Sequence, residues 1–315
     1  MSSSTKRAVI LGGTGAIGGA TAQRLASEDW SVDVTGRDPN RMPDELARFG
    51  VRFHTTDRSD GSALSQLIGD GCDLLVDLIA YSAEDVAVAL PAYRDSRSVV
   101  VISSRAVYVD ELGRHINGDE PPQFSIPLPE SNPTLAPAAP GTSPFSREGY
   151  APSKVAVEQA ALDSGLPVSI IRPSKVHGRW ARNARTSTIV RRMRENDRDL
   201  HLRRGGAMDH LTAAANTAAL IGAVAEAPAA RILNSADPDP LTAVEIVEAI
   251  ADAISWRGRV IPVGEDEPGL DLPWAAAHPI VLDTTESLGL GYRPVGAGRA
   301  LLAAEARWVA RTLAS

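Results

Sequence analysis

The chain has 315 residues, which fits one large domain or two modest ones. Its hydrophobic fraction of 43% is typical of a globular protein, and its formal net charge of −7 argues against bulk electrostatic binding to nucleic acid or anionic membranes. The single cysteine, Cys72, excludes a disulfide within the chain, and no apolar run approaches membrane-spanning length. Residues 1–7 are polar and have no signal-peptide pattern, so we expect a cytoplasmic protein.

Short apolar runs and helical segments alternate through the first half of the chain. Such alternation predicts an α/β fold with a doubly wound parallel sheet of the Rossmann type. The segments expected to form strands are 8–11, 31–35, 51–54, 72–80, 98–103 and 167–173. The segments expected to form helices are 20–25, 40–49, 59–68, 84–93 and 151–164.

The alternation is weaker beyond residue 173. We expect a Rossmann domain over 1–172 and a smaller α/β substrate domain over 173–315, with some segments of the latter returning to the former. The loop at 110–148, rich in Pro, Ser and Gly, is long enough to predict an active-site loop. The later segments expected to be regular are helices at 183–195, 213–227, 242–255 and 297–313, and strands near 199–202, 230–234 and 259–263.

The stretch 8–19 combines a strand, a glycine-rich turn and the start of a helix. Gly12 would allow a tight turn, Gly15 would let the backbone approach a phosphate, and Gly18 would let the helix pack closely on the strand. Backbone N–H groups and the helix dipole favour anions at this end of a helix. The stretch therefore predicts a dinucleotide-binding turn, and an ordinary glycine-rich turn is the alternative.

Tyr150 and Lys154 are four residues apart in a predicted helix, which places them on one face. A neighbouring ammonium group would stabilise the phenolate and lower the pKa of the tyrosine from its usual ~10. Such a phenol exchanges a proton near neutral pH, as carbonyl and alcohol redox chemistry requires. Pro152 fits this helix if it lies in the first turn, with Tyr150 at the helix start. The alternative is a surface tyrosine and lysine that share a face by chance.

A third informative segment, Ser103 to Tyr108, follows the fifth predicted strand. Ligands bind at the carboxyl ends of strands in open α/β sheets, so a serine there can hydrogen-bond a substrate oxygen; a capping serine is the alternative. Together the three segments resemble the extended, epimerase/dehydratase-like branch of the short-chain dehydrogenase/reductase superfamily. The matching motifs are the glycines at 12, 15 and 18, the Ser-Ser-x-x-Val-Tyr segment at 103–108, the Tyr-x-x-x-Lys pair at 150–154 and the Arg-Pro-x-x-Val-x-Gly segment at 172–178.

The resemblance covers residues 6–180 well and implies roles for individual residues. It implies a catalytic set of Ser104, Tyr150 and Lys154, and a homodimer that packs through a four-helix bundle including the helix of the tyrosine. Ser104, Arg105, Lys175 and His177 are expected to contact substrate. Asp57 would contact adenine, and Glu130 lies in an acidic loop ahead of the tyrosine. The residues expected to contact the cofactor are Gly12, Thr14, Gly15, Ala16, Ile17, Gly18, Arg37, Asp57, Ile79, Ala80, Ser103, Tyr150, Lys154, Pro173 and Val176.

The end of the second predicted strand bears on the choice between NAD and NADP. An acidic residue there would accept hydrogen bonds from the adenosine ribose and repel a 2′-phosphate, but the chain has Gly36 followed by Arg37. A guanidinium group can bind phosphate and stack on adenine, so NADP is favoured. Asp33 and Asp38 keep NAD open as the alternative.

Several positions depart from the branch pattern. Met208 stands where the branch often has an arginine that holds a nucleotide-sugar diphosphate, which argues against such a substrate. Arg105 stands where dehydratase-type members have an acidic residue, which argues against a dehydratase. His177 is expected to pack or to contact substrate rather than to act as a base. The scattered histidines form no ligand motif, so we expect no metal.

An arginine-rich segment spans 179–204. It could serve an anionic substrate group, nucleic acid, or a solvated helix face in which Glu195, Asp197 and Asp199 are the partners. The solvated face is the favoured interpretation for most of these arginines, and the lack of interleaved aromatic residues argues against nucleic acid.

These residues lead us to expect an NAD(P)-dependent oxidoreductase that transfers a hydride to or from a carbonyl or hydroxyl carbon of a small sugar-like or other metabolite. Tyr150 would exchange the hydroxyl proton, Lys154 would bind the nicotinamide ribose and tune Tyr150, and Ser104 would stabilise the substrate oxygen. We expect a small-molecule substrate, a homodimer, and no nucleic-acid or membrane partner. A nucleotide-sugar epimerase with tightly bound NAD, and a non-catalytic dinucleotide-sensing or RNA-binding relative, are the alternatives.

Overall fold

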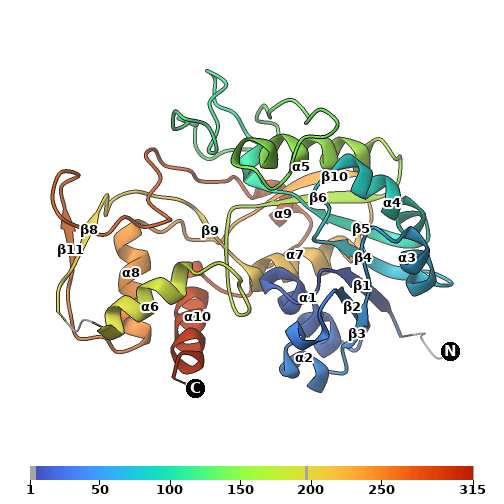
Figure 1. Ribbon diagram of the computed structural model, residues 1–315, viewed down its shortest axis with the longest axis horizontal. Helices are drawn as coiled ribbons and strands as arrows, with labels where there is room; N and C mark the ends of the chain where they lie inside the picture. The colour runs from blue at the N-terminus through green and yellow to red at the C-terminus, as the bar shows by residue number, and fades with distance from the viewer. Residues whose placement is uncertain (1–4, 196–197, 315) are drawn as a thin grey trace.

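A seven-stranded parallel β-sheet forms the centre of the computed structural model, which describes residues 5–195 and 198–314 (Figure 1). The strand order is β10-β6-β5-β4-β1-β2-β3, so the predicted doubly wound α/β fold is confirmed. Asp197, named above as an arginine partner, lies outside the described residues. The strands are β1 (Arg7–Leu11), β2 (Ser31–Gly36), β3 (Arg52–Thr55), β4 (Cys72–Asp77), β5 (Ser96–Ile102), β6 (Val168–Pro173) and β10 (Arg231–Ser235).

Helices cover both faces of this sheet (Figure 1). In β1, Ala8 and Ile10 pack into the core under one face, whereas Val9 and Leu11 pack into the core under the other. A strand buried on both faces has no polar side, which explains the continuous apolar run in the sequence. The helices of the first face are α1 (Ala16–Ser27), α2 (Asp44–Arg48) and α7 (Ala214–Glu226); those of the second are α3 (Gly61–Ile68), α4 (Ala83–Arg94) and α5 (Arg147–Leu162).

Helix α5, which carries Tyr150 and Lys154, begins at Arg147, earlier than the sequence suggests. Ser146 caps it by accepting a hydrogen bond from Gly149 N (2.9 Å). Pro152 is therefore the sixth helical residue rather than part of the first turn, and the carbonyl four residues before it loses its helical hydrogen bond. The expectation that Tyr150 stands at the helix start is wrong by one turn.

The segments after β6 build a smaller lobe, seen on the left of Figure 1. Its core lies among α6 (Arg185–Glu195), α8 (Ala243–Ala253) and α10 (Gly298–Thr312), and includes the fully buried Trp274. Two small parallel sheets complete it. They are β8 (Leu200–Arg203) with β11 (Val260–Val263), and β7 (Lys175–His177) with β9 (Leu211–Ala213).

Two segments of the second half belong to the central sheet. Helix α7 packs beside α1, and β10 pairs with β6 in register from Arg231 opposite Ser169 to Ser235 opposite Pro173. The helix expected at 40–49 is split into a 3-10 turn (Pro39–Arg41) and α2, because Pro43 has extended backbone at the α2 N-cap. Within the described part of the chain, none of the helices has the length and apolar character needed to cross a membrane.

A long loop connects the 3-10 turn η2 (Arg105–Val107) with α5. Asp110 holds its first part in place, because its carboxylate accepts hydrogen bonds from the backbone N–H groups of Leu112 (3.0 Å), Arg114 (2.8 Å) and Gln123 (2.9 Å). The loop crosses the carboxyl end of the sheet, where it contributes walls to the cavity described below. A short helix, α9 (Thr285–Gly289), packs on β10.

Candidate active site

The glycine-rich turn between β1 and α1 has the geometry that a dinucleotide pyrophosphate requires. Gly12 has a φ of +83°, and a Cβ at Gly18 would lie 2.9 Å from the Gly12 carbonyl oxygen. A Cβ at Gly15 would meet no described atom within 4 Å, so the chain leaves open space at the start of α1. No described side chain caps α1 at Gly15, which leaves its first N–H groups available to an anion. Ala16 and Ile17 follow as the first residues of α1.

A segment distant in sequence lies against this turn. Arg182 Nη2 donates a hydrogen bond to Thr14 Oγ1 (2.7 Å). Trp180 packs on α1 so closely that a Cβ at Gly19 would lie 2.4 Å from its ring. The sequence placed Arg182 only within an arginine-rich segment, because a contact across 168 residues leaves no local pattern. The contact puts a guanidinium group beside the predicted phosphate-binding turn.

The expected adenosine end of the site lies at the ends of β2 and β3. Asp57 Oδ1 accepts hydrogen bonds from Ser59 N (2.9 Å) and Ser59 Oγ (2.8 Å). These bonds, and the charge of the exposed Arg37, lower the pKa of Asp57. Arg37 and Asp57 are therefore neighbours.

The two carboxylates that kept NAD open are engaged elsewhere. Asp33 is buried, and although burial opposes the shift, hydrogen bonds from Arg52, His54 and Arg7 hold its pKa well below the usual range. Asp38 caps the following 3-10 turn by accepting a hydrogen bond from Asn40 N (3.0 Å). Neither side chain has the free position at the end of β2 that recognition of ribose hydroxyls requires.

Lys154 is buried at the carboxyl ends of β4 and β5. Its Nζ donates hydrogen bonds to Ala80 O (2.7 Å) and Ile102 O (3.0 Å), and lies 4.5 Å from the centroid of the Tyr81 ring. Burial lowers the pKa of Lys154 to about 8, against the opposing charges of Asp77 and Glu158. An ammonium group has three N–H donors, so the two carbonyls leave one for a ligand.

Tyr150 is half-buried, and burial raises the pKa of its phenol. A hydrogen bond with the Ser104 side chain opposes this shift, whereas Tyr81 adds to it. The expectation that Lys154 lowers the pKa of Tyr150 is therefore wrong, because Lys154 is not among the groups that shift it; its ammonium is held by two backbone carbonyls. The structure does bring Ser104, Tyr150 and Lys154 together at one edge of the sheet. The Ser104 hydroxyl also accepts a hydrogen bond from Ala106 N (3.1 Å), so the capping alternative holds alongside this.

Tyr81 is a site residue that the sequence analysis missed. It lies four residues after the end of β4, its ring lies against Lys154, and its ring centroid is 5.2 Å from that of Phe145 in the long loop. The signal was present in the sequence, since Tyr81 comes just after the end of a buried strand, the place where ligands bind in open α/β sheets.

The remaining predicted cofactor residues lie around the same edge. A Cβ on Gly12 would be 2.6 Å from Ile79 Cγ2, which places the end of β4 against the glycine-rich turn. Val176 in β7 pairs with Thr212 in β9 and packs with the core beneath α1, and Pro173 ends β6. The Ser103 hydroxyl donates to Glu158 within the interior, so its side chain serves the packing of α5 on the sheet.

Arg105 and Lys175, two predicted substrate residues, line a cavity of about 330 Å³. Both pair with Asp209, which the sequence analysis did not single out: Arg105 through a short ion pair, and Lys175 through an Nζ–Oδ2 distance of 3.3 Å. The long loop contributes Gly118 and Pro121 to the walls. Ser104, Tyr150 and Lys154 are not among the residues that line this cavity, but Arg105, which does line it, is the residue after Ser104.

His177 does not line this cavity, which corrects the expectation of a substrate contact. It is buried with Nε2 2.9 Å from Asp237 Oδ2 and Nδ1 3.3 Å from Glu305 Oε2 in α10. Burial disfavours its charge, but the hydrogen bond with Asp237 and the ion pair with Glu305 raise the pKa of His177 to about 9. The histidine is therefore a protonated link between β7 and α10.

Glu130 has a structural position. Its Oε1 accepts a hydrogen bond from Asn234 N in β10 (2.6 Å), and burial raises its pKa. The Glu130 carbonyl accepts from Arg172 Nη1 (3.2 Å), whose guanidinium also pairs with Glu158 (Nη2–Oε2, 2.6 Å). The acidic loop thus holds the edge of the sheet together.

Several arginines of the 179–204 segment pair with other parts of the chain. Arg203 pairs with Asp271, and Arg204 Nε lies 3.1 Å from Glu265 Oε1. Asp199, expected as a partner within the segment, instead accepts from Arg259 Nε (2.9 Å). The expected local solvated face is thus replaced, for these residues, by pairs across β8 and its surroundings.

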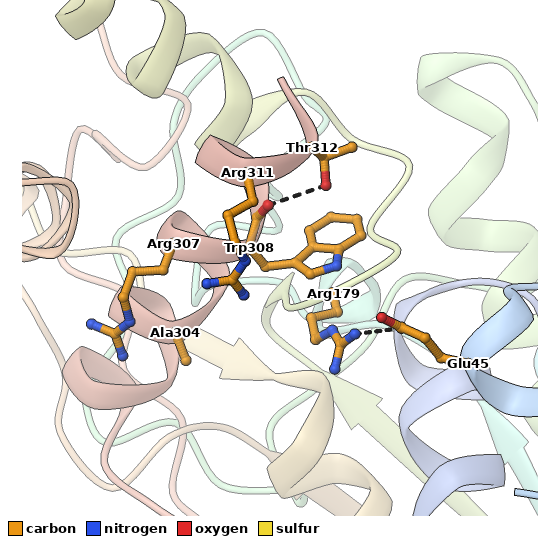
Figure 2. Close-up of a pocket in the computed structure, with 7 residues that line it drawn as sticks. All are labelled: Glu45, Arg179, Ala304, Arg307, Trp308, Arg311 and Thr312. Atoms are coloured by element: carbon orange, nitrogen blue, oxygen red, sulfur yellow. Dashed lines mark hydrogen bonds and ion pairs between the residues drawn. The ribbon is translucent and has the colours of Figure 1, made fainter. Parts of the chain in front are cut away.

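A larger cavity, about 520 Å³, lies between α2 and α10 (Figure 2). Arg179 pairs there with Glu45, and its guanidinium carbon lies 6.0 Å from the ring centroid of Trp308. Arg307 and Arg311 project from α10 on the same side. None of the predicted catalytic, cofactor or substrate residues lines this cavity, so the smaller one beside Ser104 is the candidate substrate site.

Comparisons with known proteins bear on the fold and on the nucleotide-binding domain. Residues 8–111 match the family model described as the saccharopine dehydrogenase NADP-binding domain, which covers the glycine-rich turn and the first five strands. No curated protein sequence matches the chain.

Solved structures resemble the chain over almost its whole length. A UDP-galactose 4-epimerase has 19% identity and a TM-score of 0.69, with 98% of this chain and 99% of that chain covered. A dTDP-glucose 4,6-dehydratase from Streptomyces venezuelae with NAD bound has 22% identity and a TM-score of 0.70, with 98% of each chain covered. A dTDP-glucose 4,6-dehydratase from Bacillus anthracis, in complex with NAD, has 16% identity and a TM-score of 0.70, with coverage of 98% and 97%. The chain therefore shares the fold of these epimerase and dehydratase structures.

Proposed function

We propose that the chain is an NAD(P)-dependent oxidoreductase of the extended short-chain dehydrogenase/reductase type, acting on a carbonyl or hydroxyl carbon of a small metabolite. The observation that carries this proposal is the meeting of Ser104, Tyr150 and Lys154 at the carboxyl ends of β4 and β5, beside the glycine-rich turn. A bound nicotinamide would supply or accept the hydride.

The residues of the chain divide the remaining work. Tyr150 would give or take the hydroxyl proton, and its hydrogen bond with Ser104 favours the phenolate form. Ser104 would donate a hydrogen bond to the substrate oxygen as charge develops there. Lys154, fixed by Ala80 O and Ile102 O, would direct its remaining N–H toward the nicotinamide ribose. With the cofactor bound, its positive charge would lower the pKa of Tyr150.

NADP is the favoured cofactor. The glycine-rich turn with Arg182 beside it would hold the pyrophosphate, and the exposed Arg37 would bind a 2′-phosphate. The buried and paired state of Asp33 adds support, because it removes one acidic group that NAD recognition would use. The matched family model is described as NADP-binding. NAD is the alternative, since two of the similar dehydratases hold it.

The substrate in this proposal is not a nucleotide sugar. Met208 has no charged group with which to bind a diphosphate. The nearest arginines along the chain, Arg203 and Arg204, are paired with Asp271 and Glu265. A nucleotide-sugar epimerase with bound NAD is the second candidate, and the names of similar structures favour it.

Native mass spectrometry of the freshly purified protein tests the cofactor, with NADPH and NADH added separately afterwards. We expect a protein–dinucleotide complex, with NADPH displacing NADH. Cofactor oxidation is then followed against a panel of small aldehydes and ketones in wild type and in Tyr150→Phe. A chain that binds neither dinucleotide contradicts the proposal and favours the non-enzymatic alternative.

A further inference from the structure

The cavity beside Ser104 contains charge that the proposed hydride chemistry does not use. Arg105 begins the 3-10 turn η2 after β5 and is 5% exposed, and Lys175 lies in β7 on the lobe side. Asp209, which is 3% exposed, stands between them. Long cationic side chains are rarely buried without a partner. The balance of charge around Asp209 therefore indicates which kind of ligand the cavity binds.

Two cations pair with this single carboxylate, and a third lies near them. Arg105 and Lys175 pair with Asp209, and Arg185 in α6 is close enough to feel both Asp209 and Arg105. Burial and the charges of Arg105 and Arg185 lower the pKa of Lys175, while Asp209 opposes that shift. Of the other carboxylates, Asp119 also lines the cavity, but its side chain is fully exposed beside Arg147 (3.4 Å), so water screens its charge, and Glu305 pairs with His177 (3.3 Å). The cluster therefore has positive charge in excess.

Arg105 and Lys175, the two cations that line the cavity, retain N–H donors for a ligand. Lys175 Nζ donates to Pro273 O (2.7 Å) and lies 3.3 Å from Asp209 Oδ2, which leaves one of its three N–H groups. Within the described residues, Asp209 is the side-chain partner of Arg105, and a guanidinium has five N–H donors in a planar fork. Such a fork matches the oxygen atoms of a carboxylate or phosphate.

We propose that this cavity binds an anionic group of the substrate, a carboxylate or a phosphate, between Arg105 and Lys175. The inference rests on the proposed function, because it takes the carbonyl carbon to lie at Ser104 and Tyr150. Since Arg105 is the residue after Ser104, the anionic group would be close to the reacting carbon rather than at the far end of a long substrate. Asp209, which pairs with both cations, would be their counter-ion when no substrate is bound.

The walls limit the size of that substrate. Pro121 and Pro122 in the long loop and Pro273 with Ala275 on the lobe side enclose the volume of about 330 Å³. This volume is at the low end for small-molecule sites, and proline backbones cannot yield easily. A compact hydroxy acid, keto acid or short sugar phosphate fits these limits better than a nucleotide-linked sugar.

Calorimetry on the full-length protein with saturating NADPH, repeated with NADH, tests the inference. The bound dinucleotide keeps phosphate out of the glycine-rich turn. The probes are inorganic phosphate and two matched pairs, lactate with lactamide and glycerol phosphate with glycerol. We expect anionic members to bind with Kd values on the order of 1–10 mM and neutral members to bind at least ~10-fold more weakly. A preference for lactate or for glycerol phosphate distinguishes a carboxylate from a phosphate site.

Three variants locate the binding. Lys175→Gln should weaken anion binding by ~10-fold, and Lys175→Arg should restore most of it, because the charge is what the site requires. Arg307→Gln is the matched control, since it removes a cation from the larger cavity between α2 and α10 and should leave anion binding unchanged. Asp209→Asn should strengthen anion binding by several-fold because it removes the competing carboxylate, provided that thermal unfolding shows a folded variant.

Each outcome decides the matter. The inference is overturned if no anion binds, if neutral and anionic partners bind alike, or if Lys175→Gln keeps the anion preference. Loss of anion binding in Arg307→Gln alone would move the site to the larger cavity and equally overturn it. Failure of both dinucleotides to bind would instead contradict the proposed function, which is measured in the same titrations before any anion is added.

Discussion

Lys154, a member of the proposed catalytic set, is held in place by backbone carbonyls and an aromatic ring. Two carbonyl oxygens, from the ends of β4 and β5, fix its ammonium group, and the Tyr81 ring covers one side. With a pKa of about 8 it is mostly charged at neutral pH, although it is buried. Its orientation is thus set by the sheet, and a ribose hydroxyl would need only to accept the N–H that the carbonyls leave.

Tyr150 is the residue on which the proposed chemistry depends. We expect Tyr150→Phe to lower turnover by at least ~10², the scale of general acid–base catalysis, because the variant cannot exchange the hydroxyl proton. Cofactor affinity should change by no more than a few-fold, since the phenylalanine keeps the ring. Steady-state kinetics and fluorescence titration measure the two effects. Near-full turnover would remove Tyr150 from the mechanism.

Arg37 tests the choice of cofactor. Arg37→Ala should weaken NADPH binding by ~10-fold or more and weaken NADH binding much less, because NADH lacks the 2′-phosphate that the guanidinium would bind. Calorimetric titration of both dinucleotides gives the comparison, and Arg41→Ala serves as a nearby surface control. An equal loss for both dinucleotides, or a native preference for NADH, would show that NADP is the wrong assignment.

Strand β7 and helix α10 are joined by the ion pair of His177 with Glu305. The pKa of His177 is raised to about 9 in the folded chain, against about 6.5 when unfolded. Folding therefore gains stability from this proton below pH 6.5 or so, and the gain is lost as the pH rises through about 9.

Urea unfolding of wild type and His177→Gln at pH values near 6 and near 9.5 measures this contribution. We expect the wild type to lose stability on the order of 1–3 kcal/mol more than the variant between these values, because only the wild type gives up the buried proton. A pH dependence identical in both proteins would show that the link is neutral in the folded chain.

Elements that depend on nearby residues were predicted from the sequence, whereas those that depend on distant partners were not. The hydrophobic pattern predicted the strands and helices of the central sheet, because their signals are local. Strand β1 is a continuous apolar run, and the Asp60 cap of α3 lies next to the helix that it caps. It misplaced the start of α5, because Ser146 provides a cap one turn ahead of the expected start. Short β7 and β9 were missed, since three-residue strands depend on their partner.

In the candidate site, too, local motifs were predictive and contacts between distant segments were not. Ser104, Tyr150 and Lys154 were found from motifs, and they lie together at the edge of the sheet. The contact of Arg182 with Thr14, the Arg105–Asp209 pair and the enclosure of His177 depend on how the lobe folds back, and no local pattern encodes them.

The whole molecule raises the question of assembly. On α5, Val157 and Ala161 pack inward on the sheet, whereas Ala156, Gln159 and Asp163 lie on a less buried face beside α4. We expect a homodimer in which this face and α4 meet their copies, because the small Ala156 allows close approach of a partner helix.

Light scattering at micromolar concentration should give twice the mass of one chain. Ala156→Glu should shift the protein toward the monomer, since it would place like charges across a two-fold interface. Gln159→Ala, on the same face, should leave the mass unchanged. A monomeric wild type would contradict the expectation.

Recognition of a nucleotide sugar would involve the whole lobe, and we expect UDP- and dTDP-sugars to bind weakly or not at all. Loss of a charge-assisted bidentate contact at Met208 costs about 1.5–3 kcal/mol, and Arg203 is held by Asp271. A calorimetric panel of nucleotide sugars with saturating cofactor measures this. Micromolar binding that Arg203→Ala abolishes would restore the epimerase interpretation.

The position of β10 has a consequence for synthesis of the protein on the ribosome. Strand β6 is buried along its whole length, but β10, the strand that closes its outer edge, is made only after much of the lobe has been translated. A nascent chain that has emerged only as far as β9 exposes an apolar strand with unpaired backbone groups, the template on which foreign strands add. The order of translation thus makes the interval between β6 and β10 the period in which this chain depends most on protection by chaperones.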